Sequence, residues 1–144
     1  MMRSLILLAI IISASSSYKI VAERKTYISQ RTEAMSNNIN KENVWVFIMA
    51  GQSNMAGRGI VEPEDTVSDK RIFSINKDGQ IIIAKEPLHF YEPERTGLDC
   101  GLSFAKTLIK KIPDSVSILI IPTAIGSSSI RQWLGDSVFR NAKL

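Results

Sequence analysis

The hydrophobic residues of this 144-residue chain fall into runs of two different periods, separated by polar stretches. Residues 44–50, Val-Trp-Val-Phe-Ile-Met-Ala, are apolar on both faces, which is typical of a central parallel strand. A largely apolar run at 115–121 predicts a second buried strand. Between them, apolar residues recur at helical spacing over 101–111, and this amphipathic helix is expected to end before Pro113. Two parallel strands joined by a helix form a βαβ unit, so the pattern predicts an α/β fold.

Two shorter apolar runs, at 71–75 and 80–84, flank the turn sequence Asn-Lys-Asp-Gly at 76–79. An Asp-Gly pair between two such runs is typical of a β-hairpin, which we expect as an insertion in the parallel sheet. The remaining elements expected from the pattern are surface loops at 58–70 and 86–99 and a helical turn at 130–134.

The first 43 residues are expected to lie outside the folded domain. A short basic start, a run of apolar residues and three serines give residues 1–17 the layout of a secretory signal peptide. The apolar run is shorter than the roughly 20 residues that span a bilayer. We therefore expect export to the periplasm or the exterior without stable membrane insertion after cleavage; an uncleaved anchor is the alternative. Residues 18–43 predict a polar leader or linker, with a short helix across 22–35.

The number of predicted strands is low for an open α/β sheet. Such a sheet normally contains about five strands, and the pattern gives only two central ones. Residues 136–144 show neither a helix stop nor a further strand. The segment 44–144 is therefore expected to be the N-terminal part of a larger domain.

Charge and cysteine content narrow the classes of function. The chain has 18 Lys and Arg residues against 14 Asp and Glu, a net charge of +4, which falls by one if Arg3 is removed with the first segment. These charges form no basic stripe with interleaved aromatic residues, so we expect no nucleic-acid partner. The single cysteine, Cys100, cannot form an internal disulfide, and we expect it to be a buried small hydrophobe rather than a reactive thiol.

Ser53 is the position with the clearest chemical potential. It follows the strand at 44–50 by three residues, which places its hydroxyl at the carboxyl end of a strand, where open α/β sheets bind ligands. Backbone N–H groups at the start of a following helix would face the same crevice and suit an oxyanion. Ser53 is therefore a candidate nucleophile, with the side-chain amides of Gln52 and Asn54 beside it. The alternative is a helix N-cap without chemistry.

Gly126 follows the second predicted strand in the same way. Because parallel strands end at the same edge of a sheet, its backbone N–H could approach the point reached by Ser53. The alternative is an ordinary turn glycine. The turn at 99–101 is a further candidate border of this crevice, without a spacing argument to place it.

The segment Trp45-Val-Phe-Ile-Met-Ala-Gly-Gln-Ser-Asn-Met-Ala-Gly-Arg-Gly59 does not contain the G-x-S-x-G elbow of α/β-hydrolases, because Met55 stands in place of the second glycine. It resembles the first block of the SGNH hydrolases and, more narrowly, of the sialate O-acetylesterase and acetylxylan esterase group (carbohydrate esterase family 6). The segments that agree further along the chain are Glu-Pro-Leu-His at 86–89, Gly-Leu-Ser-Phe-Ala at 101–105 and Ala-Ile-Gly-Ser-Ser-Ser-Ile-Arg-Gln-Trp at 124–133.

This resemblance implies a flavodoxin-like SGNH three-layer sandwich with a parallel sheet. It also implies release of acetate from acetylated carbohydrates such as sialic acid or xylan, with no metal and no cofactor. Ser53 is then the nucleophile, with its own amide and the Gly126 amide in the oxyanion hole. The residues expected to contact the substrate are Gln52, Asn54, Arg58 and Arg131. The two arginines are equally compatible with solvated surface charges, and Trp133 is expected to pack rather than to stack on a sugar.

The chain also departs from the pattern of this family. Ser127 stands where a second glycine is usual, which adds a Cβ near the crevice. The later W-x-Q-G-E block and the D-x-x-H that supplies acid and base do not occur within 1–144. His89, near Glu86 and Glu92 in sequence, could substitute as the base, but the resemblance places it away from the catalytic position.

Without its acid and base, the chain alone is expected to hydrolyse acetyl esters negligibly. The alternative is a non-catalytic or vestigial carbohydrate-binding module of the same fold. Hydrolysis of a lipid ester or a thioester by this fold is a third possibility.

Overall fold

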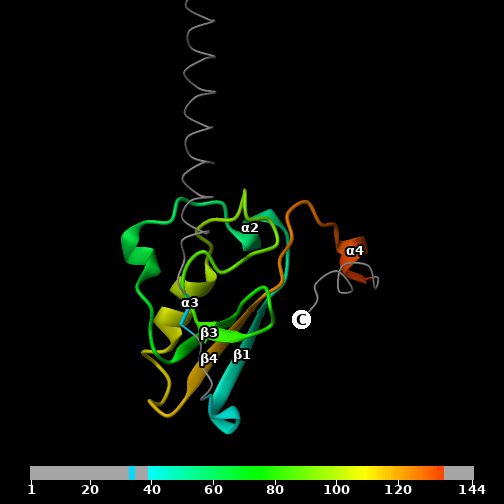
Figure 1. The fold of residues 1–144 in the computed structure, drawn as a ribbon. Coiled ribbons are helices and arrows are strands. Elements are labelled where there is room, and N and C mark those ends of the chain that lie inside the picture. The colour runs from blue at the N-terminus through cyan, green and yellow to red at the C-terminus, as the bar shows by residue number, and fades with distance from the viewer. Residues whose placement is uncertain (1–32, 35–38, 135–144) are drawn as a thin grey trace, which may run out of the picture.

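The computed structural model describes residues 33–34 and 39–134 (Figure 1). The predicted signal peptide, the helix predicted across 22–35 (except residues 33–34, which are not helical) and most of the linker lie outside these residues, as does the segment 135–144. The elements in chain order are η1 (Lys41–Asn43), β1 (Val44–Met49), α2 (Ser53–Ala56), η2 (Pro63–Thr66), β2 (Ile72–Ile75), β3 (Ile81–Ile83), α3 (Gly101–Leu108), β4 (Ser117–Pro122) and α4 (Ile130–Leu134). Among the described residues, no helix has the length and apolarity needed to cross a bilayer.

The four strands form one sheet in the order β1-β4-β2-β3. β1 and β4 run parallel, with Val44 opposite Ser117 and Met49 opposite Pro122, and they lie side by side in Figure 1. The predicted α/β class with a parallel sheet and the predicted hairpin of β2 and β3 are confirmed. The expectation that this hairpin is an insertion is wrong, because β2 also pairs in parallel with β4 and so forms a third parallel strand.

β1 is an edge strand within the described part of the chain, where β4 is its sheet neighbour. Val46 and Ile48 are 50% and 65% exposed, and Trp45 on the other face is 47% exposed. The strand itself is confirmed, but the expectation that it lies at the centre of the sheet with both faces covered is wrong for these residues. An apolar strand pattern indicates which side chains favour burial, but it does not show whether other elements of the chain cover them.

The hydrophobic core lies between the sheet and α3. Its buried residues are Met49, Ile72, Ala84, Leu88, Leu102, Ala105, Ile109, Ile118 and Ile120. The first residue of α3, Gly101, packs so closely on Met49 and Leu88 that a Cβ there would collide with both side chains. The α3 helix ends at Leu108, earlier than the predicted 111, although Ile109 just beyond it is still buried. The helix predicted between the two apolar strands is thus confirmed, and it provides the cover for one face of the sheet.

Candidate active site

Ser53 is the first residue of the one-turn helix α2, just beyond the carboxyl end of β1. The N-cap of α2 is Gln52, whose side-chain oxygen Oε1 accepts from the Ser53 N–H at 3.1 Å. The Ser53 hydroxyl donates to the same oxygen at 2.8 Å. The alternative interpretation of Ser53 as a helix N-cap is therefore wrong, because Gln52 has that role.

The segment that follows β4 lies beside the segment that follows β1 and is hydrogen-bonded to it. Thr123 donates to the Met49 carbonyl through its N–H, at 3.2 Å, and through its hydroxyl, at 3.1 Å. Two residues further on, the Ile125 N–H donates to the Gly51 carbonyl at 3.1 Å. The structure thus brings together the two segments that the sequence placed at one edge of the sheet, those of Ser53 and Gly126.

The Gly126 N–H is occupied by a carboxylate. It donates to Glu92 Oε2 at 2.6 Å, and Arg58 Nη2 donates to the same oxygen at 2.8 Å. Burial alone would raise the pKa of Glu92, but the Gly126 N–H and the Arg58 guanidinium outweigh it and hold this pKa below its usual value. Sequence reasoning named Glu92 only as a neighbour of His89 and missed this contact, because nothing local links three residues from three separate loops.

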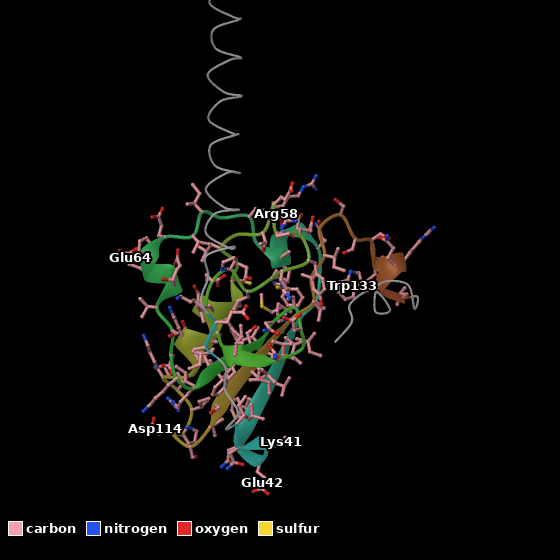
Figure 2. The ribbon with its side chains drawn as sticks, viewed as in Figure 1. Lys41, Glu42, Arg58, Glu64, Asp114 and Trp133 are labelled. Carbon is pink, nitrogen blue, oxygen red and sulfur yellow. The ribbon has the colours of Figure 1, made fainter. Side chains whose placement is uncertain are left out.

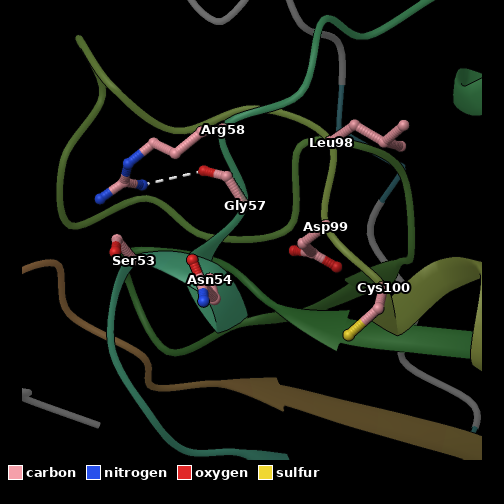
Figure 3. A pocket seen from close by; sticks show the side chains of 7 residues that line it. All are labelled: Ser53, Asn54, Gly57, Arg58, Leu98, Asp99 and Cys100. Atoms are coloured by element: carbon pink, nitrogen blue, oxygen red, sulfur yellow. Dashed lines mark hydrogen bonds between the residues drawn. The ribbon is translucent and has the colours of Figure 1, made fainter.

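Ser53 opens onto a pocket of about 380 Å³ (Figure 3). Its lining residues are Ser53, Asn54, Gly57, Arg58, Leu98, Asp99 and Cys100. Gly57 has a φ of 76°, and a Cβ there would collide with the backbone at Leu98 and the side chain of Asp99. This close approach, continued by the Gly59–Leu98 backbone bridge, explains why the turn at 99–101 borders the serine.

Cys100 corrects a sequence-based expectation. It is exposed, not buried, and it lines the pocket with Ser53. Its Sγ lies 3.9 Å from Met55 Sδ. The average preference of cysteine for burial could not reveal that this residue lies where the loop 86–99 meets α3, at the mouth of a pocket.

His89 is buried and is not a hydrogen-bond partner of Ser53 among the described residues. Its Nδ1 is 2.9 Å from Asp99 Oδ2, and the second oxygen of Asp99 accepts from the Gly101 N–H at 2.6 Å. Neither Glu86 nor Glu92 is the acidic partner of His89, so the Ser53–His89–Glu arrangement is not formed. Within the described residues, the Ser53 hydroxyl donates to an amide oxygen and not to a base.

Of the other residues predicted to contact the substrate, some line the pocket and one does not. Asn54 and Arg58 line the pocket, whereas Arg131 is exposed on α4 and is not among the described residues that line it. Trp133 donates from Nε1 to Ser128 Oγ at 2.9 Å, and Ser128 Oγ lies 3.2 Å from the Gly51 carbonyl oxygen. Trp133 therefore anchors α4 to the loop after β1.

No group of three or more metal-ligating side chains occurs within 33–34 and 39–134.

The fold and the site together define an α/β protein with a serine-centred crevice at the carboxyl ends of two neighbouring parallel strands. A family model described as "Carbohydrate esterase, sialic acid-specific acetylesterase" matches residues 43–142, and the chain belongs to this family. The resemblance noted from the sequence, and the flavodoxin-like SGNH fold class expected from it, are confirmed.

A probable carbohydrate esterase agrees with this membership in both its sequence and its fold. A probable carbohydrate esterase of Arabidopsis thaliana is 30% identical over 105 residues, which cover 61% of this chain and 40% of that protein. The X-ray structure of this same Arabidopsis thaliana protein matches with a TM-score of 0.61 and 27% identity, over 69% of this chain and 48% of that one. The crystal structure of NanS matches with a TM-score of 0.47 and 25% identity, over 63% and 38%. The chain thus spans less than half the length of these relatives.

Proposed function

We propose that this protein acts as a carbohydrate O-acetylesterase, in which Ser53 attacks the acetyl carbonyl of an acetylated sugar such as sialic acid or xylan. One observation carries the proposal: Ser53 begins α2 at the end of β1, on an open pocket, beside the loop that carries Gly126 after β4. A hydroxyl at that edge of a parallel sheet, with backbone N–H groups near it, is the arrangement that acyl transfer needs.

The reaction would proceed in two displacements. Ser53 Oγ bonds to the acetyl carbon while its proton passes to a base, and the carbonyl oxygen takes the negative charge. Collapse of this intermediate breaks the bond between the acetyl carbon and the sugar oxygen, which takes the proton from the base and leaves as a hydroxyl, so that acetyl-Ser53 remains. Water, giving its proton to the same base, then attacks acetyl-Ser53 and releases acetate and the free serine. The Ser53 and Gly126 N–H groups would stabilise the charged oxygen once Gln52 and Glu92 no longer accept from them.

No base contacts Ser53 within the described residues, so the proposed reaction requires one from outside them. His89 is directed to Asp99 instead, and the Ser53 proton is held by Gln52. Imidazole added to the solution can replace a missing histidine base, because general-base catalysis requires only a suitable group within hydrogen-bonding reach.

This leads to a direct test with the 144-residue chain. We expect imidazole to produce release of acetate from O-acetylated sialic acid or acetylated xylan, on the order of tenfold or more above the Ser53→Ala variant in the same buffer. Mass spectrometry should find the acetyl group on Ser53. Ser68→Ala, an exposed loop serine, is the matched control and should behave as the unsubstituted chain does. Equal rates for the unsubstituted and Ser53→Ala chains at every imidazole concentration would rule out the proposed reaction for this chain.

A non-catalytic carbohydrate-binding module is the second candidate. It is favoured by one observation, that the Ser53 hydroxyl and both proposed oxyanion donors already have acceptors within the chain. This candidate predicts saturable binding of an acetylated sugar with equal affinity in the unsubstituted and Ser53→Ala chains, and no acetyl group on Ser53.

Export is a separate proposal that rests on the sequence of residues 1–17. N-terminal sequencing of the mature protein should find a new terminus near residue 18. An unprocessed Met1 terminus would contradict it.

A further inference from the structure

Two hydrogen-bond donors from different loops converge on one oxygen atom, Glu92 Oε2. The Gly126 N–H lies 2.6 Å from it, and Arg58 Nη2 lies 2.8 Å from it. A third group, Arg95, approaches the other carboxylate oxygen at 3.9 Å. A backbone N–H and a guanidinium aimed at one oxygen are a binding arrangement for a carboxylate or an oxyanion, because both donors favour negative charge on the acceptor.

Arg58 and the segment of Gly126 are also held in place by contacts that do not involve Glu92. Arg58 Nη1 donates to the Gly57 carbonyl at 2.9 Å, a contact that Figure 3 shows. Gly126 follows Ile125, whose N–H is bonded to the Gly51 carbonyl. A Cβ at Gly126 would overlap both the Arg58 guanidinium and the Glu92 carboxylate, so the absence of a side chain there provides the room for the anion. The site should therefore keep its shape when Glu92 is removed.

Glu92 itself is placed as a ligand that can be exchanged. Its side chain is 22% exposed, and it lies on the long loop between β3 and α3 rather than on a strand or helix. Arg58 also lines the pocket of Ser53, whereas Glu92 and Gly126 are not among its described lining residues, so the Glu92 position adjoins this pocket through Arg58. The lowered pKa of Glu92 agrees with this, since it shows that the site favours a carboxylate over a carboxylic acid.

We propose that the Gly126 N–H and the Arg58 guanidinium form a carboxylate-binding site that adjoins the Ser53 pocket, filled by Glu92 in the resting chain and open to a small external carboxylate such as acetate when Glu92 is withdrawn. Acetate is the product of the proposed esterase reaction, and in this respect the inference rests on that function. In the esterase, the developing acyl oxyanion would compete with Glu92 for the Gly126 N–H. Glu92 would thus be a positioning residue that limits access to this donor.

The experiment follows the Gly126 backbone amide by NMR in the full 144-residue chain while sodium acetate is added at constant ionic strength. In Glu92→Ala we expect a saturable shift of this amide. An attached carboxylate competes at a local concentration in the millimolar range or above, so the affinity for acetate in Glu92→Ala should exceed that of the unsubstituted chain on the order of tenfold. Acetamide, which has the same shape without the charge, should give no saturable shift.

Matched variants separate charge from shape. Glu64→Ala removes an equal charge from η2, which Figure 2 shows away from Arg58, and should bind acetate as the unsubstituted chain does. Glu92→Gln keeps the size of the side chain and should give an intermediate affinity. It also serves as the test if Glu92→Ala does not fold. Adding Arg58→Gln to Glu92→Ala should weaken acetate binding at least several-fold.

An acetate response of Gly126 that is no greater in Glu92→Ala and Glu92→Gln than in the unsubstituted chain would overturn the proposal. So would an equal response to acetamide. Neither readout involves ester hydrolysis, so a chain that binds acetate here but never acetylates Ser53 would refute the esterase and leave the site intact. A chain that acetylates Ser53 but shows no stronger acetate binding in Glu92→Ala would refute the carboxylate site and leave the esterase proposal intact.

Discussion

The Ser53 hydroxyl donates a hydrogen bond to the side-chain carbonyl of Gln52 at 2.8 Å. The same Gln52 oxygen accepts from the Ser53 N–H at 3.1 Å, so one amide holds both the proposed nucleophile and one proposed oxyanion donor. An amide oxygen is far too weak a base to take a proton from serine. The contact therefore fixes the orientation of Ser53 without activating it.

The Gln52 contact should be measurable as stability. Because Gln52 is the N-cap of α2, Gln52→Ala removes the acceptor of the Ser53 N–H and should lower the free energy of unfolding by about 1 kcal/mol. Ser53→Ala removes only the hydroxyl and should cost less than about 0.5 kcal/mol. Urea unfolding of both variants checks this, and a larger loss in Ser53→Ala than in Gln52→Ala would contradict it.

Glu92 should make stability depend on pH in the acid range. Its pKa in the folded chain is held below the ordinary value of 4.5, so the folded chain binds this proton less readily than the unfolded chain. Its contribution to stability is therefore complete above about pH 4.5 and is lost as the pH falls through the lower, folded pKa. The difference in Tm between the unsubstituted chain and Glu92→Gln should shrink over that window, since the other titrating groups are common to both. A difference that stays constant from neutral pH to about pH 3 would contradict the proposed charge pair.

Ser127 is a non-glycine residue with a φ of 62°. A side chain in this left-handed region costs on the order of 1 kcal/mol. Ser127→Gly should therefore raise the free energy of unfolding by about 0.5–1 kcal/mol, after allowing for the greater freedom of glycine in the unfolded chain. Ser127→Ala keeps the Cβ and removes only the hydroxyl, so it should give no such gain. Thermal melts of the two variants compare them directly.

Ser74 is fully buried in β2, and its hydroxyl has no partner among the described residues. An unsatisfied buried hydroxyl costs roughly 1–3 kcal/mol, so Ser74→Ala should raise the free energy of unfolding by about 1 kcal/mol. Thr123 provides a matched control, because its buried hydroxyl donates to the Met49 carbonyl at 3.1 Å. Thr123→Val should lower stability, and the same sign of change for both variants would contradict this account.

Local sequence patterns predicted most of the elements. The period of the apolar residues located β1, β4 and α3, and the Asp-Gly turn located the hairpin, because each is decided within a few consecutive residues. The pairing of β2 with β4 was missed. Four residues, Ile-Phe-Ser-Ile, are too few to show whether a strand is an insertion or part of a parallel sheet, since its neighbour lies more than 40 residues away.

The candidate site could be predicted where it depends on strand ends and not where it depends on loops. Ser53 and Gly126 follow neighbouring parallel strands, and a parallel sheet brings such segments together whatever the loops do. The contact of Glu92 with Arg58 and Gly126 depends instead on the path of the loop 86–99. The pairing of His89 with Asp99, ten residues apart in that same loop, is equally invisible to periodicity.

β1 is bonded to β4 along one side and, among the described residues, presents its other side without a neighbouring strand. Val46 and Ile48 lie along this strand with at least half of each side chain in contact with water. Any extended segment added there would cover backbone groups and apolar side chains in a single step. The strand that ends just before the Ser53 hydroxyl is thus also the strand whose edge, among the described residues, can pair with an added extended segment.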